Sequence, residues 1–355
     1  MRKMASIQKV REILPHNNAD ALELAMINDW QVVVKKGEFK KDELVVYFEV
    51  DSWVPNELAP FLSKGKEPRE YEGVKGERLK TVKIRGEVGQ GLVLPLNADI
   101  LFRIESWVTF NIGLNNQLFE GMDVTEALNV KKWEPTLATC LRGLARSNFP
   151  AEIPKTDQER IQNLSKYWDG IKDKTWEVTE KLHGSSCTFY LDSEDVFHVC
   201  SRNLDLKYDE NNAYWKIAKM YNIESTMRSY DLNGYAIQGE LVGEGINGNQ
   251  YGVKGLDFYV FDIYNSNSKK YLTPENRIKL TEALGLKHVP VISRCEKIQS
   301  ETIKDLLSVV EKQKSNLNTS NIEGWVFKVY DESTLDPRDV KSFKVISNAW
   351  LLKNE

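Results

Sequence analysis

Residues 1 to 98 carry short apolar runs separated by turn-forming residues. β-Branched and aromatic side chains dominate the runs at 30–37, 43–55, 77–86 and 90–96, with Gly, Asp and Pro between them. Runs of this kind are typical of strands, and several short strands in so few residues predict a small barrel of the OB type.

The C-terminal part of the chain, from about residue 150 onward, alternates strand-like and helix-like patterns. The stretches 208–230, 273–283 and 302–317 have helical character. A further short helix is expected after Thr156, because Glu159 follows it at the spacing of a capping box.

Residues 99 to 150 have a mixed pattern that predicts an extra strand, a short helix and a connector. A chain of 355 residues suits about two domains. We therefore expect an N-terminal domain at 1–135 and a C-terminal domain at 136–355.

The composition excludes several classes of protein. Hydrophobic residues make up 41% and charged residues 28% of the chain, as in an ordinary globular protein. No apolar run approaches the roughly 20 residues that a membrane span needs, so no membrane partner is expected. The N-terminus lacks the apolar core of a signal peptide.

The four cysteines show no paired spacing, which disfavours a zinc site or a disulfide framework. They are Cys140, Cys187, Cys200 and Cys295. A reduced, cytoplasmic protein is the resulting expectation.

The net charge of −4 gives no overall nucleic-acid signal, so any such site must be a local patch. One basic run contains a single acid, Glu77, and has two interpretations: a groove that follows the phosphates of a nucleic acid, or a solvated strand face. Its basic residues are Lys75, Arg78, Lys80, Lys83 and Arg85.

The stretch EKLHGSS lies at the end of a strand-like run, WEVTEKLHG. Because strand side chains alternate, Lys181 and His183 share one face and Leu182 lies on the other. Gly184 allows something to approach the backbone closely. Taken alone, the pattern also fits an edge strand with a solvated polar face.

Later strand-like segments each place an unusual polar or aromatic group among apolar residues. In chain order they contribute Arg202, Glu240, Phe261 with Asp262, Glu323 with Lys328, and Lys341 with Lys344. Each one taken singly has a bland interpretation as a solvated strand residue, but the ordered set is hard to dismiss.

In this order the segments resemble the signature of the covalent nucleotidyltransferase superfamily, the ATP-dependent ligases and RNA-capping guanylyltransferases. The first element of that family, Lys-x-(Asp/His/Asn)-Gly, is here Lys181-Leu182-His183-Gly184. The histidine form is typical of RNA ligase 2-like enzymes. Eleven residues follow Lys344, so we expect the branch that carries an OB domain ahead of the catalytic domain and none after it.

The resemblance implies an α+β protein. Its C-terminal nucleotidyltransferase (ATP-grasp-like ligase) domain would consist of antiparallel sheets with flanking helices, preceded by a small β-barrel OB-type domain. The implied activity is ATP-dependent joining of RNA 3′-hydroxyl and 5′-phosphate ends through a lysyl-AMP intermediate and an adenylylated 5′ end, in RNA repair. ATP and Mg²⁺ or Mn²⁺ are the expected cofactors, broken or nicked RNA is the partner, and the protein is expected to be a monomer.

The resemblance also implies roles for individual residues. Lys181 would be the nucleophile, with His183 and Lys344 as further catalytic groups and Glu240 and Glu323 as metal ligands. The nucleotide would be bound by Glu180, Lys181, Arg202, Glu240, Phe261, Glu323, Lys341 and Lys344, together with Arg160 and Gln162 from upstream. The basic run at 75–85 would bind RNA.

One departure concerns the last motif, which in the family is Lys-x-Lys. Here Lys341 and Lys344 are three residues apart, so they point to opposite faces of a regular strand. Lys344 is preferred, with Lys341 or Lys328 contacting other phosphates. Two alternatives remain at this point: a ligase acting on DNA or RNA–DNA hybrids, and a catalytically inert RNA-binding protein with the same fold.

Overall fold

A computed structural model describes residues 2–111, 117–134, 143–331 and 339–355. The chain forms two compact units. The first comprises Met1–Pro135, Glu159–Trp168 and Asn348–Glu355, and the second comprises Thr136–Gln158 and Asp169–Ser347. The predicted boundary between 135 and 136, and Cys140, lie outside the described residues.

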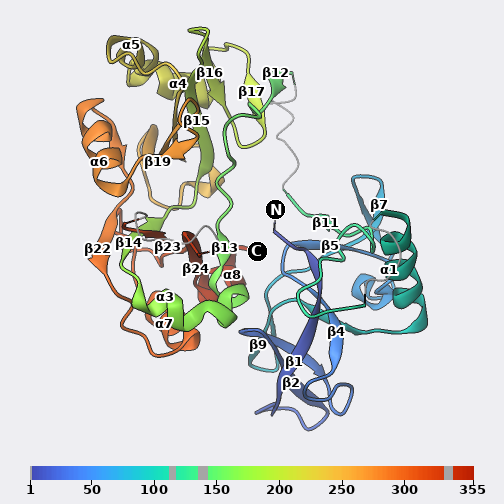
Figure 1. The fold of residues 1–355 in the computed structure, drawn as a ribbon. Coiled ribbons are helices and arrows are strands. Elements are labelled where there is room, and N and C mark those ends of the chain that lie inside the picture. Colours follow the sequence, from blue (N-terminus) through green and yellow to red (C-terminus); the bar gives the residue numbers. More distant parts are fainter. Residues whose placement is uncertain (1, 112–116, 135–142, 332–338) are drawn as a thin grey trace. The chain divides into compact units, whose positions relative to one another are not determined.

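The first unit is built on a curled antiparallel sheet (Figure 1). Across this sheet the order is β10 (Leu92–Pro95), β4 (Leu44–Phe48), β1 (Ala5–Pro15), β2 (Leu22–Ile27) and β3 (Trp30–Lys35). A second sheet has the order β11 (Lys131–Lys132), β5 (Ser52–Pro55), β7 (Val74–Arg78) and β6 (Arg69–Tyr71).

Helix α1 (Ala98–Asn111) covers one face of the main sheet of the first unit, where Ile100 and Ile104 join the core formed with β1 and β4. The opposite face has its own apolar cluster around Trp30. A separate two-stranded hairpin consists of β8 (Val82–Ile84) and β9 (Glu87–Gly89). The remaining elements are η1 (Pro60–Ser63), β13 (Glu159–Arg160), η2 (Ile161–Tyr167) and α8 (Asn348–Asn354).

The large sheet of the second unit is antiparallel except for one short parallel strand at its edge. Its order is β12 (Ala145–Asn148), β17 (Leu204–Leu206), β16 (Phe197–Cys200), β15 (Ser185–Leu191), β18 (Tyr235–Gly243), β19 (Leu256–Asn265) and β20 (Lys270–Tyr271), with β21 (Lys287–His288) parallel to β19. Helices α4 (Ala213–Met220) and α5 (Ile223–Ser229) pack on its core face.

A smaller sheet carries the lysine motif. It pairs β24 (Ser342–Ile346), β23 (Gly324–Val329), β14 (Trp176–Lys181) and β22 (Val291–Glu296) in that order. Trp176, Phe327 and Phe343 pack against one another on its core face. Flanking elements are α3 (Trp168–Asp173), η3 (Asn247–Asn249), α6 (Pro274–Ala283) and α7 (Ile303–Glu311). The α+β prediction is confirmed.

Of the helical stretches predicted at 208–230, 273–283 and 302–317, the second forms α6 and the third forms α7, which ends at Glu311. Thr273 caps α6, and Thr302 forms a capping box with Asp305 at the start of α7. The predicted helix at 208–230 is instead two helices, because Asn222 adopts a left-handed conformation between them, with φ of 50°.

The expected capping box at Thr156 is wrong. The carboxylate of Glu159 accepts hydrogen bonds from Arg160 N and from Asn163 Nδ2 at 2.8 Å, and η2 begins at Ile161 with Arg160 as its N-cap. Glu159 therefore has a local partner that a spacing rule does not consider.

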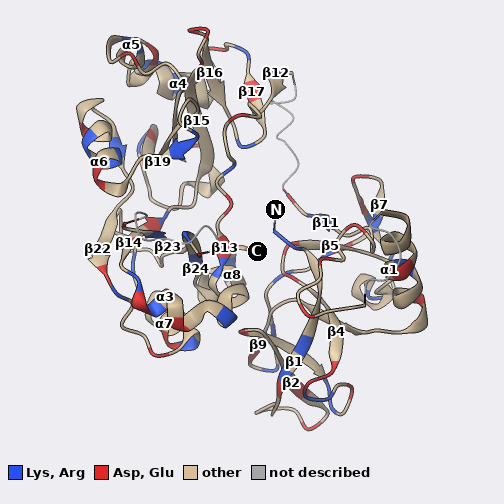
Figure 2. Ribbon diagram, viewed as in Figure 1, with Lys and Arg blue, Asp and Glu red and all other residues tan. Residues whose placement is uncertain are grey.

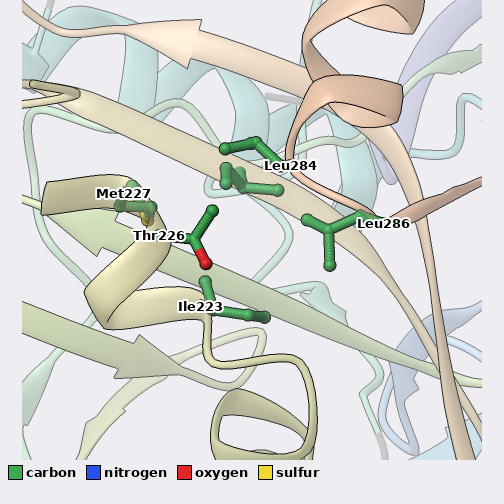
Figure 3. Close-up of a pocket in the computed structure, with 6 residues that line it drawn as sticks. Ile223, Thr226, Met227, Leu284 and Leu286 are labelled. Atoms are coloured by element: carbon green, nitrogen blue, oxygen red, sulfur yellow. The ribbon is translucent and has the colours of Figure 1, made fainter. Parts of the chain in front are cut away.

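No described helix has both the length and the apolar composition needed to cross a bilayer. A small pocket between α5 and the turn after α6 is lined mainly by aliphatic side chains (Figure 3). Its lining offers no charged group to a nucleotide, so we assign it to packing of the core.

Candidate functional site

Lys181 is the last residue of β14, and its ammonium group forms an ion pair with Glu323. Lys181 Nζ and Glu323 Oε1 are 2.6 Å apart, and His183 Nδ1 lies 3.6 Å from Glu323 Oε2. Glu323 immediately precedes β23 and is buried. The structure thus brings three predicted site residues together from segments about 140 positions apart in the chain.

Glu240 joins this group from β18. Its Oε1 accepts a hydrogen bond from Gly184 N at 2.8 Å. Burial raises the pKa of Glu240 to about 7, with Lys181 opposing the rise and Glu323 adding to it. Burial also acts to raise the pKa of Glu323, but Lys181 and His183 outweigh it and hold that pKa below its ordinary value.

Position 184 must be glycine because the backbone of β18 passes too close to it for a side chain. A Cβ atom at this position would lie 2.2 Å from Leu241 O and 2.8 Å from Val242 Cγ1. The group that approaches Gly184 closely is therefore strand β18. Gly324, next to Glu323, is in the same situation, since its Cβ would lie 2.1 Å from Val345 O.

A glycine-rich strap between β18 and β19 holds the backbone of the lysine motif. Tyr251 Oη accepts a hydrogen bond from His183 N at 2.6 Å, and Asn247 Nδ2 donates one to Gly184 O at 2.5 Å. Sequence analysis missed both residues. The available signal was the strap itself, GEGINGNQYGVKG, whose density of Gly and Asn predicts an unusual backbone.

The loop that follows α7 extends this support to the residue before the lysine. Asn316 N donates to Glu180 Oε2 at 2.8 Å. Asn318 Nδ2 donates to Gln250 O at 2.9 Å, and Gln250 Nε2 donates to Asn321 O at 3.1 Å, so the loop and the strap are bonded to each other. Together they form a polar collar around residues 180–184.

Strand register decides which lysine of the last motif faces the site. Thr179 pairs with Val326, and Val326 pairs with Lys344, so their side chains share one sheet face. Lys181 lies on that face too, two residues beyond Thr179. Lys341 is exposed and precedes β24, and its carbonyl accepts a hydrogen bond from Val329 N.

Phe261 is placed by a β-bulge in β19. Gln238 pairs with Asp262 and Gly239 pairs with Val260, which leaves Phe261 as the extra residue. Phe261 packs against the small apolar cluster that contains Leu182.

The side chain of Lys328 is bonded to residues of the same bulge. Its Nζ lies 2.8 Å from Asp262 Oδ2, donates to Phe261 O at 2.6 Å, and is 5.9 Å from the centre of the Phe261 ring. Burial, with Arg277 nearby, lowers the pKa of Lys328 despite the opposing effect of Asp262. Asp262 also faces Arg277, whose guanidinium is bonded to Glu177.

The remaining predicted nucleotide ligands are not among the described side chains that contact Lys181 or Glu323 in their own unit. Arg202 follows β16 and forms an ion pair with Asp157 at 2.9 Å. Arg160 and Gln162 belong to the first compact unit, where the guanidinium of Arg160 faces Asp51 and Glu355.

The predicted RNA-binding residues divide into two groups in the first unit, along which acidic and basic residues are interspersed (Figure 2). Arg78 forms an ion pair with Asp51 at 2.6 Å, Lys75 pairs with Glu67, and Lys80 donates to the carbonyl of Glu355. Lys83 and Arg85 form the second group, on the exposed hairpin of β8 and β9.

The carboxylates fit a divalent cation. Glu323 Oε2 is buried and makes no hydrogen bond to a described residue, and carboxylate oxygens are the ligands that Mg²⁺ and Mn²⁺ prefer. Among the described residues no group of three or more His, Cys, Asp or Glu side chains is arranged to hold a metal. Phosphates of a substrate and water would therefore complete the coordination.

Comparisons with known proteins agree with this geometry. The family model for RNA ligase matches residues 174–346, and a model for an OB-fold domain matches residues 4–96. No curated protein matches the chain.

The solved structures that resemble the chain include three of Naegleria gruberi RNA ligase: a glutamate-to-alanine mutant with AMP and Mn, a lysine-to-alanine mutant with ATP and Mn, and the enzyme with pyrophosphate. Each is 39% identical to this chain, covers 99% of both chains and has a TM-score of 0.85. The chain therefore belongs to the RNA ligase family.

Proposed function

We propose that the protein is an ATP-dependent RNA ligase that joins RNA 3′-hydroxyl and 5′-phosphate ends through a lysyl-AMP intermediate. The observation that carries the proposal is Lys181 at the end of β14, paired with Glu323 and adjacent to Glu240. The related structures contain ATP, AMP, pyrophosphate and Mn, the molecules that this chemistry needs.

The reaction has three balanced steps. The Lys181 amine forms a bond to the α-phosphorus of ATP, the bond to the bridging oxygen breaks, and pyrophosphate leaves. An oxygen of the RNA 5′-phosphate then forms a bond to the phosphorus of the AMP, the bond between that phosphorus and the lysine nitrogen breaks, and the Lys181 amine is released. Finally the 3′-hydroxyl attacks the RNA phosphorus, gives up its proton and expels AMP.

Lys181 must lose a proton before it attacks, because an ammonium group has no lone pair. The ion pair with Glu323 stabilises the ammonium form. When Glu240 and Glu323 hold a divalent cation, it neutralises phosphate charge at the reacting centre. With Glu323 engaged in this way, its carboxylate would stabilise the charge on Lys181 less, which would favour the amine form.

Glu180 and Phe261 are proposed to recognise adenine. Phe261 offers a partly exposed ring for stacking beside Leu182. Glu180 Oε1 is buried and has no hydrogen-bond partner among the described residues. This oxygen would accept from the amino group of adenine, whereas the carbonyl oxygen at the same position of guanine would repel it.

Further proposed roles follow from the sheet face. Lys344, on the face of Lys181, contacts the α-phosphate, and His183 contacts phosphate or metal-bound water. Arg202 binds ribose or phosphate of the nucleotide or RNA. Roles for Lys341, Arg160 and Gln162 at the phosphates stay predictions.

Tyr251 and Asn247 act as positioning residues. Their hydrogen bonds fix the backbone of His183 and Gly184 without touching the reacting atoms. A nucleophile that is held in place reacts faster because less orientational freedom is lost at the transition state.

The substrate is RNA, and we propose repair of nicked or broken strands as its use. A monomeric state and a cytoplasmic location stay predictions from sequence. The OB-type unit is proposed to grip the RNA.

The test is to mix the protein with α-labelled ATP and a divalent metal, without RNA, and to look for label on the denatured protein. Wild type and an exposed-lysine control, Lys216→Ala, should be labelled, and Lys181→Ala should not. Absence of label from wild type with both ATP and GTP would contradict the proposal and favour an inert RNA-binding protein.

A further inference from the structure

The hairpin of β8 and β9 carries the two basic residues of the run whose side chains have neither an ion pair nor a hydrogen bond to a described residue. Lys83 and Arg85 are both exposed, and neither forms an ion pair with any described residue. By contrast, Arg78 is bound to Asp51 and also lies 3.8 Å from the centre of the Trp133 ring. The structure therefore separates a structural part of the run from an available part.

Arg85 occupies the first position of the hairpin turn, where an asparagine would be more stable. Ile84 pairs with Glu87, so Arg85 and Gly86 form a two-residue turn. Their φ values of 46° and 97° match a type I′ turn, in which Asn-Gly is the favoured sequence. An arginine in this left-handed position is uncommon and points to a role for its side chain.

The backbone of the hairpin is anchored while its basic side chains project into solvent. Asn18 Nδ2 donates to Arg85 O at 3.0 Å, and Gln31 Nε2 donates to Val88 O at 2.8 Å. Glu87, the acid of the hairpin, accepts from Asn17 Nδ2 at 2.5 Å and so is held at the base. A held backbone presents its charges at low entropic cost.

Two aliphatic side chains accompany the basic ones. Val82 and Ile84 are 43% and 37% exposed and lie on the strand face opposite Lys83. An exposed β-ribbon with basic and apolar side chains matches a nucleic-acid strand, which has phosphate charge on one side and sugar faces on the other.

We infer that the β8–β9 hairpin is an RNA contact of the OB-type unit, in which Lys83 and Arg85 bind backbone phosphates and Val82 and Ile84 lie against ribose. This inference rests on the proposed function, because it takes RNA as the partner. It assigns the contact to the hairpin tip and assigns Lys75, Arg78 and Lys80 to the structure of the unit.

The test measures binding of a fluorescent nicked RNA duplex to the full-length protein, without ATP, between about 50 and 200 mM salt. Log affinity falls as log salt rises, and each lost phosphate contact makes this fall less steep by about 0.7 to 0.9. The double variant Lys83→Gln, Arg85→Asn should therefore lower the slope by about 1.5 and weaken binding about 20- to 60-fold near 0.1 M salt.

Arg85→Asn provides an internal control for folding. Because Asn suits the left-handed turn position, this single variant should melt at the same temperature as wild type or higher while it binds RNA more weakly. Lys36→Gln, at an exposed lysine in the turn that follows β3, removes one charge and should leave the slope unchanged.

Two results would overturn the inference: an unchanged slope in the double variant, or an equal loss in Lys36→Gln, which would show diffuse charge attraction. Labelling with ATP in the absence of RNA separates this inference from the proposed function. Wild type and the double variant should be labelled alike, so lost labelling of wild type refutes the ligase while unchanged RNA binding refutes the hairpin contact.

Discussion

Two tetrapeptides of this chain are nearly the same, and the structure uses them in opposite ways. Lys83-Ile84-Arg85-Gly86 and Lys181-Leu182-His183-Gly184 both end a strand with two cationic or titratable side chains and a glycine. The first forms an exposed turn in which Gly86 has φ of 97°. The second is enclosed, and its glycine is needed because Leu241 O lies where a Cβ would be.

The surroundings of the two lysines explain the difference. Lys181 has Glu323 within 2.6 Å and Glu240 nearby, and a strap bonds the backbone of the residues that follow it. Lys83 has no described acidic partner and faces solvent. The same local pattern is therefore enclosed beside carboxylates in one place, where we propose phosphoryl chemistry, and exposed in the other, where we infer a contact with RNA.

The largest expected effect comes from removing the carboxylate that distinguishes the enclosed lysine. Glu323→Gln should slow lysyl-AMP formation by about 100-fold or more, because it removes a carboxylate that we propose as a metal ligand beside Lys181. Quenched-flow labelling with ATP measures the rate. Glu301→Gln, which breaks an exposed ion pair with Lys172, should label at the wild-type rate.

The need for glycine at position 184 is tested by adding one methyl group there. Gly184→Ala should destabilise the protein by about 1–3 kcal/mol, because the Cβ overlaps a backbone carbonyl that a side-chain movement cannot relieve. Gly170→Ala, in α3 and with nothing within 4 Å of its Cβ, should be neutral or stabilising. Equal melting temperatures for the two variants would contradict the assignment.

The strap is tested by removing one hydroxyl group. Tyr251→Phe leaves His183 N without its acceptor and should lower the rate of lysyl-AMP formation about 10-fold at saturating ATP. Because the tyrosine is a positioning residue, the KM for ATP should not change. As a control, Tyr230→Phe removes a hydrogen bond to Ala283 O that does not involve the lysine motif. This variant should change neither the rate of lysyl-AMP formation nor the KM for ATP.

The smallest expected effect is a pH-dependent change in the free energy of unfolding that comes from His198. Hydrogen bonds to Asp205 and Asp192 raise the pKa of His198 above its ordinary value. This stabilisation is fully present below pH about 6.5 and is lost as pH rises through the raised pKa. His198→Asn should therefore destabilise the protein by about 1–2 kcal/mol at low pH and by less at pH about 9.

Chemical denaturation of wild type and His198→Asn across this pH range measures the difference. A destabilisation that is constant with pH would mean that the histidine acts through packing alone.

Some features were set by local sequence alone. The strand runs, the caps at Thr273 and Thr302, and the order of Lys181, Glu240, Glu323 and Lys344 in the chain could be read directly, since they depend on residue type and short spacing. The resemblance to RNA ligases, carried by the same ordered residues, is confirmed by the family match.

Other features depended on contacts between distant segments. The support of the lysine motif by Tyr251 and Asn247, and the separation of Arg78 from Arg85, arise from residues that are brought together by long loops. The bulge that places Phe261 is a register shift between two strands, and no spacing within one strand records it.

By itself, the sequence determined which groups are available for chemistry and on which strands they lie, because side-chain chemistry and alternation along a strand are local properties. Tertiary structure alone decided which of two similar Lys-x-x-Gly turns is enclosed beside a carboxylate and which is exposed. The physical reason is that burial and an adjacent carboxylate change what a lysine does, and both are supplied by segments far away in the chain.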